Sequence, residues 1–149
     1  LDQLCRRVER VGEVGAGSAM KLAINLPLLV AYQALGEAYI LCRGLGLEPK
    51  WVMEFFADTS GAPNILKVRG PVIAQSLAGE PPPPPAFDVD LIRKDLRTMI
   101  AEAQSLGATL PLAERTLQIY DQAAADGLGK HDGTVLPAYW PGKHAAKGA

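Results

Sequence analysis

The chain has 149 residues, which is enough for one domain with a sizeable hydrophobic core but too few for two complete domains. Hydrophobic residues make up 48% of the sequence and charged residues 21%, a composition that excludes an intrinsically disordered protein. The formal net charge is -1 and the lysines and arginines are scattered, so we expect neither nucleic acid nor an anionic membrane as a partner.

Two short elements are expected at the start of the chain. Residues 1–10 carry apolar side chains at helical spacing and are typical of the end of a helix, and residues 8–14 favour an extended edge segment. The first residues do not resemble a signal peptide, so we expect a cytoplasmic protein. Cys5 and Cys42 fit no metal-binding or disulfide spacing and are interpreted as reduced thiols.

A long apolar helix is expected next. Gly15-Ala16-Gly17 predicts a turn, and residues 18–43 predict a helix that Gly17 or Ser18 can cap. Apolar residues lie on every face of this helix. The pattern therefore predicts a central helix that the other helices surround.

The same long helix contains a proline and a strongly apolar middle part. Pro27 removes one backbone hydrogen bond, which predicts a bend within a single helix. Residues 23–35 are the most apolar part, but two amide side chains interrupt them and they are too short to span a membrane. We interpret them as the middle of a buried core helix.

The rest of the chain predicts further helices joined by turns. Prolines at first helical positions, aspartate caps and glycines after the last turn mark their ends. The expected helices run from Pro49 past Phe56, from about Ala62 to Leu77, from Val89 to Leu106, from Pro111 to about Ala125, and from Asp132 towards Tyr139. Residues 81–85 are all proline and predict a polyproline II connector. The predicted fold class is all-α, a helical bundle around one long central helix.

Lys21 and Asn25 are the first candidates for chemistry. Their four-residue spacing places both side chains on one face of the central helix, one turn apart. A lysine can act as general acid or base if partial burial lowers its pKa, and a neighbouring amide can orient a substrate hydroxyl. A solvated lysine beside a packing asparagine would show the same spacing, so the pattern by itself leaves both interpretations open.

The glycine turn before these residues does not complete a nucleotide-binding motif. Met20 stands where the dinucleotide fingerprint needs its third glycine, and no acidic residue follows at the required distance. Lys21 does not directly follow a glycine, which excludes a phosphate-binding P-loop.

The motif Gly15-x-Gly17-x-x-x-Lys21-x-x-x-Asn25 resembles the interdomain motif of β-hydroxyacid dehydrogenases of the 3-hydroxyisobutyrate dehydrogenase type. In that family the lysine is the catalytic acid or base, and the asparagine helps to hold the substrate. The resemblance implies that Lys21 is catalytic and that Gly17 and Asn25 bind the substrate.

A second segment, Phe87 followed by Lys94-Asp95, is similar to another motif of the same family. There the lysine reaches the cofactor, NAD or NADP, and the other two residues line or brace the active site. The resemblance implies that Lys94 binds the cofactor and that Phe87 and Asp95 support the site. Without the resemblance, Lys94-Asp95 would be an ordinary solvated pair on a helix.

A third segment, residues 127–132, resembles the glycine-aspartate turn that closes the family's helical domain. Lys130 stands where the family more often has an acidic residue. We therefore assign this segment no catalytic role.

The resemblance implies a C-terminal helical domain of the 6-phosphogluconate dehydrogenase-like superfamily. Residues 1–14 would be the end of a preceding Rossmann domain, residues 15–140 the helical substrate and dimerisation domain, and residues 141–149 a frayed tail. The implied enzyme uses NAD or NADP on a short β-hydroxyacid, as in 3-hydroxyisobutyrate dehydrogenases or tartronate semialdehyde reductases. This chain alone would be inactive, and it would form homo-oligomers through helical surfaces.

Three alternatives stay in view. The 6-phosphogluconate dehydrogenases typically place a histidine before the asparagine, where Ile24 stands here. Imine reductases share the architecture but usually lack the lysine that is present as Lys21. A non-catalytic helical dimerisation module would not need all of the polar motif residues. The sequence leaves open which hydroxyacid binds and whether the cofactor is NAD or NADP.

Overall fold

The computed structural model describes residues 8–82 and 84–144, which are mostly helical. The six α-helices are α1 (Ala16–Cys42), α2 (Pro49–Ala57), α3 (Ile65–Leu77), α4 (Val89–Ser105), α5 (Pro111–Ala123) and α6 (Leu136–Lys143). Three short helical segments, Arg43–Leu45, Ala124–Leu128 and Gly133–Val135, adjoin them. Within the described ranges the only β-type pairing is a single bridge between Asp88 and Asp132. The all-α prediction is confirmed.

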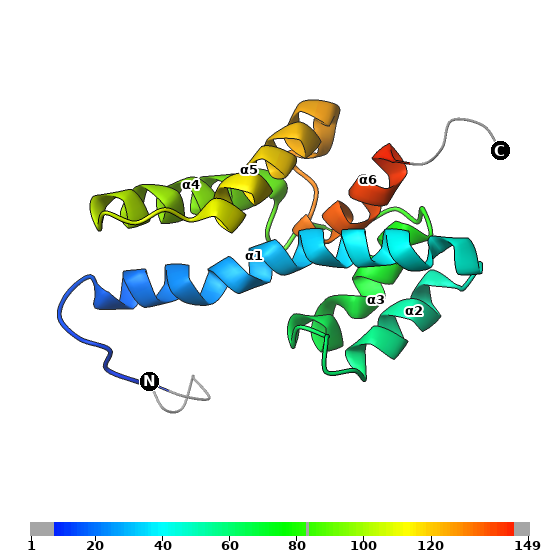
Figure 1. Cartoon of the computed structure of the whole chain (residues 1–149), viewed down its shortest axis with the longest axis horizontal. Helices are drawn as coiled ribbons and strands as arrows, with labels where there is room; N and C mark the ends of the chain where they lie inside the picture. The colour runs from blue at the N-terminus through cyan, green and yellow to red at the C-terminus, as the bar shows by residue number, and fades with distance from the viewer. Residues whose placement is uncertain (1–7, 83, 145–149) are drawn as a thin grey trace.

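α1 is the longest helix, and α4, α5 and α6 pack directly on it, whereas α2 and α3 pack mainly on each other. α4 and α5 form a pair on one side of it, and α2 and α3 form a second pair on the other side of its C-terminal half (Figure 1). α6 packs against α1 and also contacts α3. This arrangement agrees with a bundle built around one long helix.

α1 begins two residues earlier than the sequence pattern predicts. Gly15 is its cap residue and has a φ of 99°, a left-handed conformation that glycine adopts at little cost. Gly17 and Ser18 lie inside the first turn, so the prediction that one of them caps the helix is wrong. The helix continues through Pro27 to Cys42, as the single-helix prediction requires.

Residues 8–14 do not form the predicted extended edge segment. They are irregular, with bends at Gly12 and Glu13 followed by a turn. A strand is stable only when a neighbouring edge satisfies its backbone groups, and no segment in the described part of the chain offers one. Residues 1–7, which include Cys5, lie outside the described residues.

α1 is buried mainly in its C-terminal half, which corrects the prediction of a helix surrounded by all the others. Its buried residues are Leu29, Tyr32, Gln33, Leu35 and Gly36. By length and composition the continuous helical stretch Ala16–Leu45 could cross a membrane, a test that core helices of soluble proteins also pass. Only 28% of its most apolar window is buried inside the described structure. The exposed apolar residues of the N-terminal half therefore remain uncovered by the described chain.

The hydrophobic core lies where α1, α3, α4, α5 and α6 meet. Its fully buried side chains include Leu29, Ile73, Ile92, Leu96, Tyr120 and Leu136. The Tyr120 hydroxyl donates a hydrogen bond of 3.3 Å to the backbone carbonyl of Leu29, which joins α5 to α1. A Cβ at Gly36 would lie 3.1 Å from the Pro137 backbone, so glycine allows α6 to approach α1 closely.

The remaining helix ends follow most of the sequence signals. α2 and α5 begin with a proline, and Asp88 caps α4 by accepting a hydrogen bond of 2.8 Å from the Leu91 amide. α3 begins three residues after the predicted Ala62. α6 extends to Lys143, so the first residues of the expected frayed tail are helical, and residues 145–149 lie outside the described residues.

Gly133 is a position at which packing requires glycine. A Cβ there would overlap the terminal methyl of Ile92 and lie 3.3 Å from the Tyr32 ring, and Ile92 is fully buried and cannot turn away. We expect Gly133→Ala to lower the free energy of unfolding by about 1–3 kcal/mol, measured by urea denaturation. Gly44→Ala is the control, because a Cβ there meets nothing within 4 Å. Equal losses in both variants would contradict the packing explanation.

Candidate functional site

Gly17, Lys21 and Asn25 lie at four-residue intervals on α1, and this set is called here the Lys21 face. α1 is continuous across all three residues, so they project from one side of the helix on successive turns. Gly17 and Lys21 are exposed and Asn25 is half-buried. The Lys21 face therefore lies on a side of the N-terminal half of α1 that the other helices do not fully cover.

The Lys21 face leads along α1 into the interior of the bundle. Tyr32 lies seven residues beyond Asn25, about 10 Å further along the same side of the helix, and it is buried. Burial raises the pKa of the Tyr32 hydroxyl, the Arg69 guanidinium opposes this shift, and the Asp132 carboxylate adds to it. The same side of α1 therefore carries the exposed Lys21 at one end and, further along, the buried Tyr32, which lies in a polar cluster with Arg69 and Asp132.

Nothing in the described chain requires glycine at position 17. Its φ is not in the left-handed region, and a Cβ there would meet nothing within 4 Å. Glycine inside a helix costs about 0.5–1 kcal/mol relative to alanine. The missing side chain leaves room for a ligand or another domain to approach the helix.

A distant segment fixes the start of α4 through backbone hydrogen bonds, called here the α4 pairing. The N–H groups of Val89, Asp90 and Gly133 donate to the carbonyl oxygens of His131, Gly129 and Phe87, at 3.0, 2.9 and 3.0 Å. With the cap bond from Asp88, the first-turn amides of α4 are satisfied within the chain. This helix N-terminus is therefore not open to bind a phosphate.

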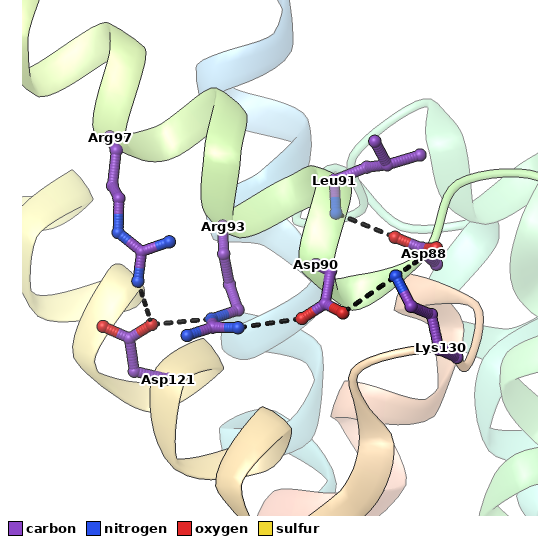
Figure 2. A network of polar contacts seen from close by, with 7 residues as sticks. All are labelled: Asp88, Asp90, Leu91, Arg93, Arg97, Asp121 and Lys130. Carbon is purple, nitrogen blue, oxygen red and sulfur yellow. Dashed lines mark hydrogen bonds and ion pairs between the residues drawn. The ribbon is translucent and has the colours of Figure 1, made fainter.

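A network of ion pairs holds α4 to α5 and to the turn before Asp132 (Figure 2). The Arg93 guanidinium lies 2.8 Å from Asp90 and 2.6 Å from Asp121. Arg97 also pairs with Asp121, and Lys130 Nζ lies 3.0 Å from Asp90. Hydrogen bonds from Lys130 and Arg93 hold the pKa of the Asp90 carboxyl below its ordinary value. Lys130 thus forms an ion pair that stabilises the start of α4.

Asp132 is buried, with 2% of its surface exposed, and hydrogen-bond donors surround its carboxylate. Oδ1 accepts hydrogen bonds from the Thr134 amide and hydroxyl at 3.0 and 2.8 Å. Oδ2 accepts from the amides of Ala86 and Phe87 at 2.9 and 3.3 Å, and Arg69 lies 3.4 Å away. Burial raises the pKa of this carboxyl, but the hydrogen bonds outweigh burial and hold the pKa below its ordinary value.

Phe87, Lys94 and Asp95 lie on the segment that Asp132 anchors. Phe87 and Asp95 are half-buried, whereas Lys94 is exposed on the side of α4 opposite its buried residues. Among the described residues no hydrogen bond or ion pair joins Lys94 or Asp95 to Lys21 or Asn25. The chain therefore does not bring the two motifs into direct polar contact.

Lys21 and Lys94 have no carboxylate partner in the part of the chain that the structure describes. Exposed ammonium groups of this kind suit the phosphate or carboxylate of a ligand. The described residues supply no glycine-rich phosphate loop of the kind that binds a dinucleotide. The same residues include no group of three or more His, Cys, Asp or Glu that could hold a metal ion.

An apolar groove of about 610 Å³ lies away from these residues, between α1 and the loop after α2. Its lining comprises Ala31, Ala34, Leu35, Ala38, Phe56, Thr59, Gly61, Ala62 and Pro63. No predicted site residue contributes to it. With no charged group in its lining, the groove is suited to packing and not to acid-base chemistry.

The chain matches a known protein family over most of its length. The family model described as "NAD-binding of NADP-dependent 3-hydroxyisobutyrate dehydrogenase" covers residues 15–139. The chain belongs to this family. This match confirms the family predicted from the motifs that contain Lys21 and Lys94. At the level of the family, it also confirms the prediction of NAD or NADP as the cofactor.

Relatives of the 3-hydroxyisobutyrate dehydrogenase family agree with this assignment. The 2-(hydroxymethyl)glutarate dehydrogenase of Eubacterium barkeri is 28% identical, over 94% of this chain and 45% of that protein. The 3-hydroxyisobutyrate dehydrogenase structure from Salmonella typhimurium has a TM-score of 0.80 at 26% identity, over 93% of this chain and 47% of that one. The Mycobacterium tuberculosis enzyme with L-serine has a TM-score of 0.71 at 27% identity, over 89% and 46%. This chain spans less than half the length of each protein.

Sequence reasoning missed part of what the structure brings together in this 3-hydroxyisobutyrate dehydrogenase-like domain. Asp132 was expected to cap the last helix, but it caps the short segment Gly133–Val135 through Thr134, and α6 begins only at Leu136. Its bonds to Ala86 and Phe87 had no local signal. Arg69 is 63 residues away from Asp132 in sequence, so no spacing could have paired them. The roles of the six predicted site residues stay predictions.

Proposed function

We propose that this chain is the helical domain of an NAD(P)-dependent dehydrogenase or reductase that acts on a short β-hydroxyacid. The Lys21 face carries the proposal, because it presents a lysine and an amide on the open end of α1 in a chain of this family. Relatives named for 2-(hydroxymethyl)glutarate and 3-hydroxyisobutyrate, and one studied with L-serine, support the substrate class. Each of these molecules has a hydroxyl on the carbon β to a carboxylate.

Lys21 is the proposed acid or base. NAD or NADP, if bound beside the Lys21 face, would supply the hydride acceptor or donor for the carbon that bears the substrate hydroxyl. Lys21 Nζ takes the hydroxyl proton during oxidation and returns it during reduction, so that full charge does not develop on the oxygen. Since Lys21 is exposed here, another surface must cover it to exclude water. We assign this role to a dinucleotide-binding domain lying against the apolar N-terminal half of α1.

Asn25 and Gly17 are the proposed substrate-binding residues on either side of Lys21. The Asn25 carboxamide can both donate and accept hydrogen bonds, so it can orient a hydroxyl one helical turn from the lysine. Gly17, one turn in the other direction, leaves space for the substrate carboxylate against the helix.

Lys94 is the proposed cofactor contact on α4. Its exposed ammonium group has no partner among the described residues and can bind an oxygen of NAD or NADP. The half-buried Phe87 and Asp95 brace the same segment.

Substitution of the two lysines separates their proposed roles. In the enzyme with its dinucleotide-binding domain, we expect Lys21→Ala to lower kcat by roughly two to four orders of magnitude with little change in cofactor affinity. Lys94→Ala should instead raise the KM for the cofactor more than it lowers kcat. Steady-state kinetics measures both effects, and Lys67→Ala, at an exposed lysine of α3, is the control. Near-normal kcat in Lys21→Ala would contradict the mechanism.

Gly17→Ala should separate stability from activity. We expect the free energy of unfolding to rise by up to about 1 kcal/mol, because alanine favours the helix and nothing lies within 4 Å of its Cβ. The KM for the hydroxyacid should increase, because the new methyl group occupies the proposed carboxylate position. Urea denaturation and steady-state kinetics measure the two effects. An unchanged KM would remove Gly17 from the substrate site.

We also propose that the protein forms homo-oligomers through its helical surfaces. Leu41, in the C-terminal half of α1, is an exposed hydrophobic side chain with 88% of its surface exposed. The apolar groove beside α1 adds small side chains that let another helix approach closely. Exposed apolar side chains beside an apolar groove commonly mark a protein interface.

Charge on the exposed side of α1 should weaken this association. We expect Leu41→Asp to shift the protein towards monomers because the carboxylate would have to be desolvated in the interface. Sedimentation velocity at several concentrations measures the shift. Val68→Asp, at a 71% exposed position of α3, is the control and should leave the distribution unchanged. A parent protein that stays monomeric at high concentration would refute the proposal.

A further inference from the structure

We propose that Asp132 is a positioning residue whose buried carboxylate holds the amides of Ala86 and Phe87, directly before α4, and thereby helps to set the position of Lys94. The inference rests on the proposed function in one respect, namely that Lys94 contacts the cofactor. It assigns a positioning role to the segment around Asp132, for which the sequence analysis proposed no catalytic role.

The segment before α4 depends on Asp132 for its anchoring. Residues 86–88 belong to no helix and directly follow the proline run. The amides of Ala86 and Phe87 both donate to Asp132 Oδ2, and the Phe87 carbonyl accepts a hydrogen bond of 3.0 Å from the Gly133 amide. Both backbone polar groups of Phe87 are therefore held by Asp132 and the residue after it. Removal of the carboxylate would free the amides of Ala86 and Phe87, while the hydrogen bond from the Gly133 amide to the Phe87 carbonyl would remain.

Asp132 is itself fixed by the helical bundle. Thr134, which is fully buried, donates two hydrogen bonds to Oδ1 from its amide and its hydroxyl. Arg69 of α3 approaches Oδ2 and also interacts with Tyr32 of α1. The carboxylate thus links α1 and α3 to the start of α4. Because the bundle determines its position, it can serve as a rigid reference for the segment.

The α4 pairing transmits this constraint to Lys94. The amides of Val89 and Asp90 are bonded to the turn that precedes Asp132, at 3.0 and 2.9 Å. A Cβ at Gly129 in that turn would lie 2.9 Å from the Asp90 carboxylate, so the two segments are in close contact. Lys94 follows Asp90 by four residues, or about 6 Å along α4. A rotation of the first turn would therefore move the lysine with it.

Thr134→Val is the control for a purely structural role of Asp132, in which the carboxylate would stabilise the fold without positioning the segment before α4. This variant removes the hydroxyl donor at Oδ1 of the same carboxylate but leaves both hydrogen bonds at Oδ2 to Ala86 and Phe87. It should lower stability without loosening the segment before α4. The comparison of Asp132 variants with Thr134→Val therefore separates positioning from stabilisation.

Amide hydrogen exchange at Ala86 and Phe87 is the first measurement. We expect exchange to be at least roughly tenfold faster in Asp132→Ala than in the parent protein, and unchanged in Thr134→Val at matched global stability. Asp132→Asn keeps one acceptor oxygen and should give an intermediate rate. If Asp132→Ala does not fold, the exchange rates of Asp132→Asn are compared with those of the parent protein instead.

Cofactor binding is the second measurement. The Kd for NADH or NADPH is measured by fluorescence titration of the enzyme that includes its dinucleotide-binding domain. We expect Asp132→Ala to raise the Kd about three- to tenfold, and Thr134→Val to leave it unchanged. Adding Lys94→Ala to Asp132→Ala should raise the Kd little further, because both changes act on the same contact.

The outcomes distinguish this inference from the proposed function. Unchanged amide exchange in Asp132→Ala, or effects of Asp132→Ala and Lys94→Ala that multiply independently, would overturn the positioning role. A Kd unaffected by Lys94→Ala, together with faster exchange in Asp132→Ala, would overturn the proposed cofactor contact of Lys94 itself.

Discussion

The carboxylate of Asp132 is the interaction on which the arrangement of the site depends. A buried charge is costly unless donors surround it, and here two amides of the segment before α4, the Thr134 amide and hydroxyl, and Arg69 all approach it. These donors come from separate parts of the chain. The need to solvate one carboxylate therefore fixes α3, the start of α4 and the turn before α6 relative to one another.

α1 combines support and presentation in one helix. Its C-terminal half is held in the core by the Tyr120 hydroxyl and by the close approach of α6 at Gly36. Its N-terminal half packs Leu22 and Leu26 against the core and carries the Lys21 face on another, more exposed side. A helix anchored at one end presents side chains at its open end more precisely than a loop would. The incomplete burial of α1 is thus consistent with a site that a second surface completes.

The charged residues divide into two groups. Arg69, Arg93, Arg97 and Lys130 are paired with aspartates that join the helices, and these pairs fix geometry. Lys21 and Lys94 have no such partner among the described residues and retain their hydrogen-bonding capacity for a ligand. The lysines proposed for chemistry are therefore among those that make no ion pair within the described chain, as is the control residue Lys67.

The sequence by itself determined the helices and the local geometry of the motifs. Proline, glycine and aspartate signals act through neighbouring backbone groups, so they marked α2, α4 and α5, and a four-residue spacing sufficed to put Lys21 and Asn25 on one face. Tertiary structure alone decided that residues 8–14 form no strand, that α1 is only partly buried, and that Asp132 holds Phe87. Strand pairing, burial and the solvation of a buried charge depend on groups far apart in sequence, and no local pattern records which distant groups will meet.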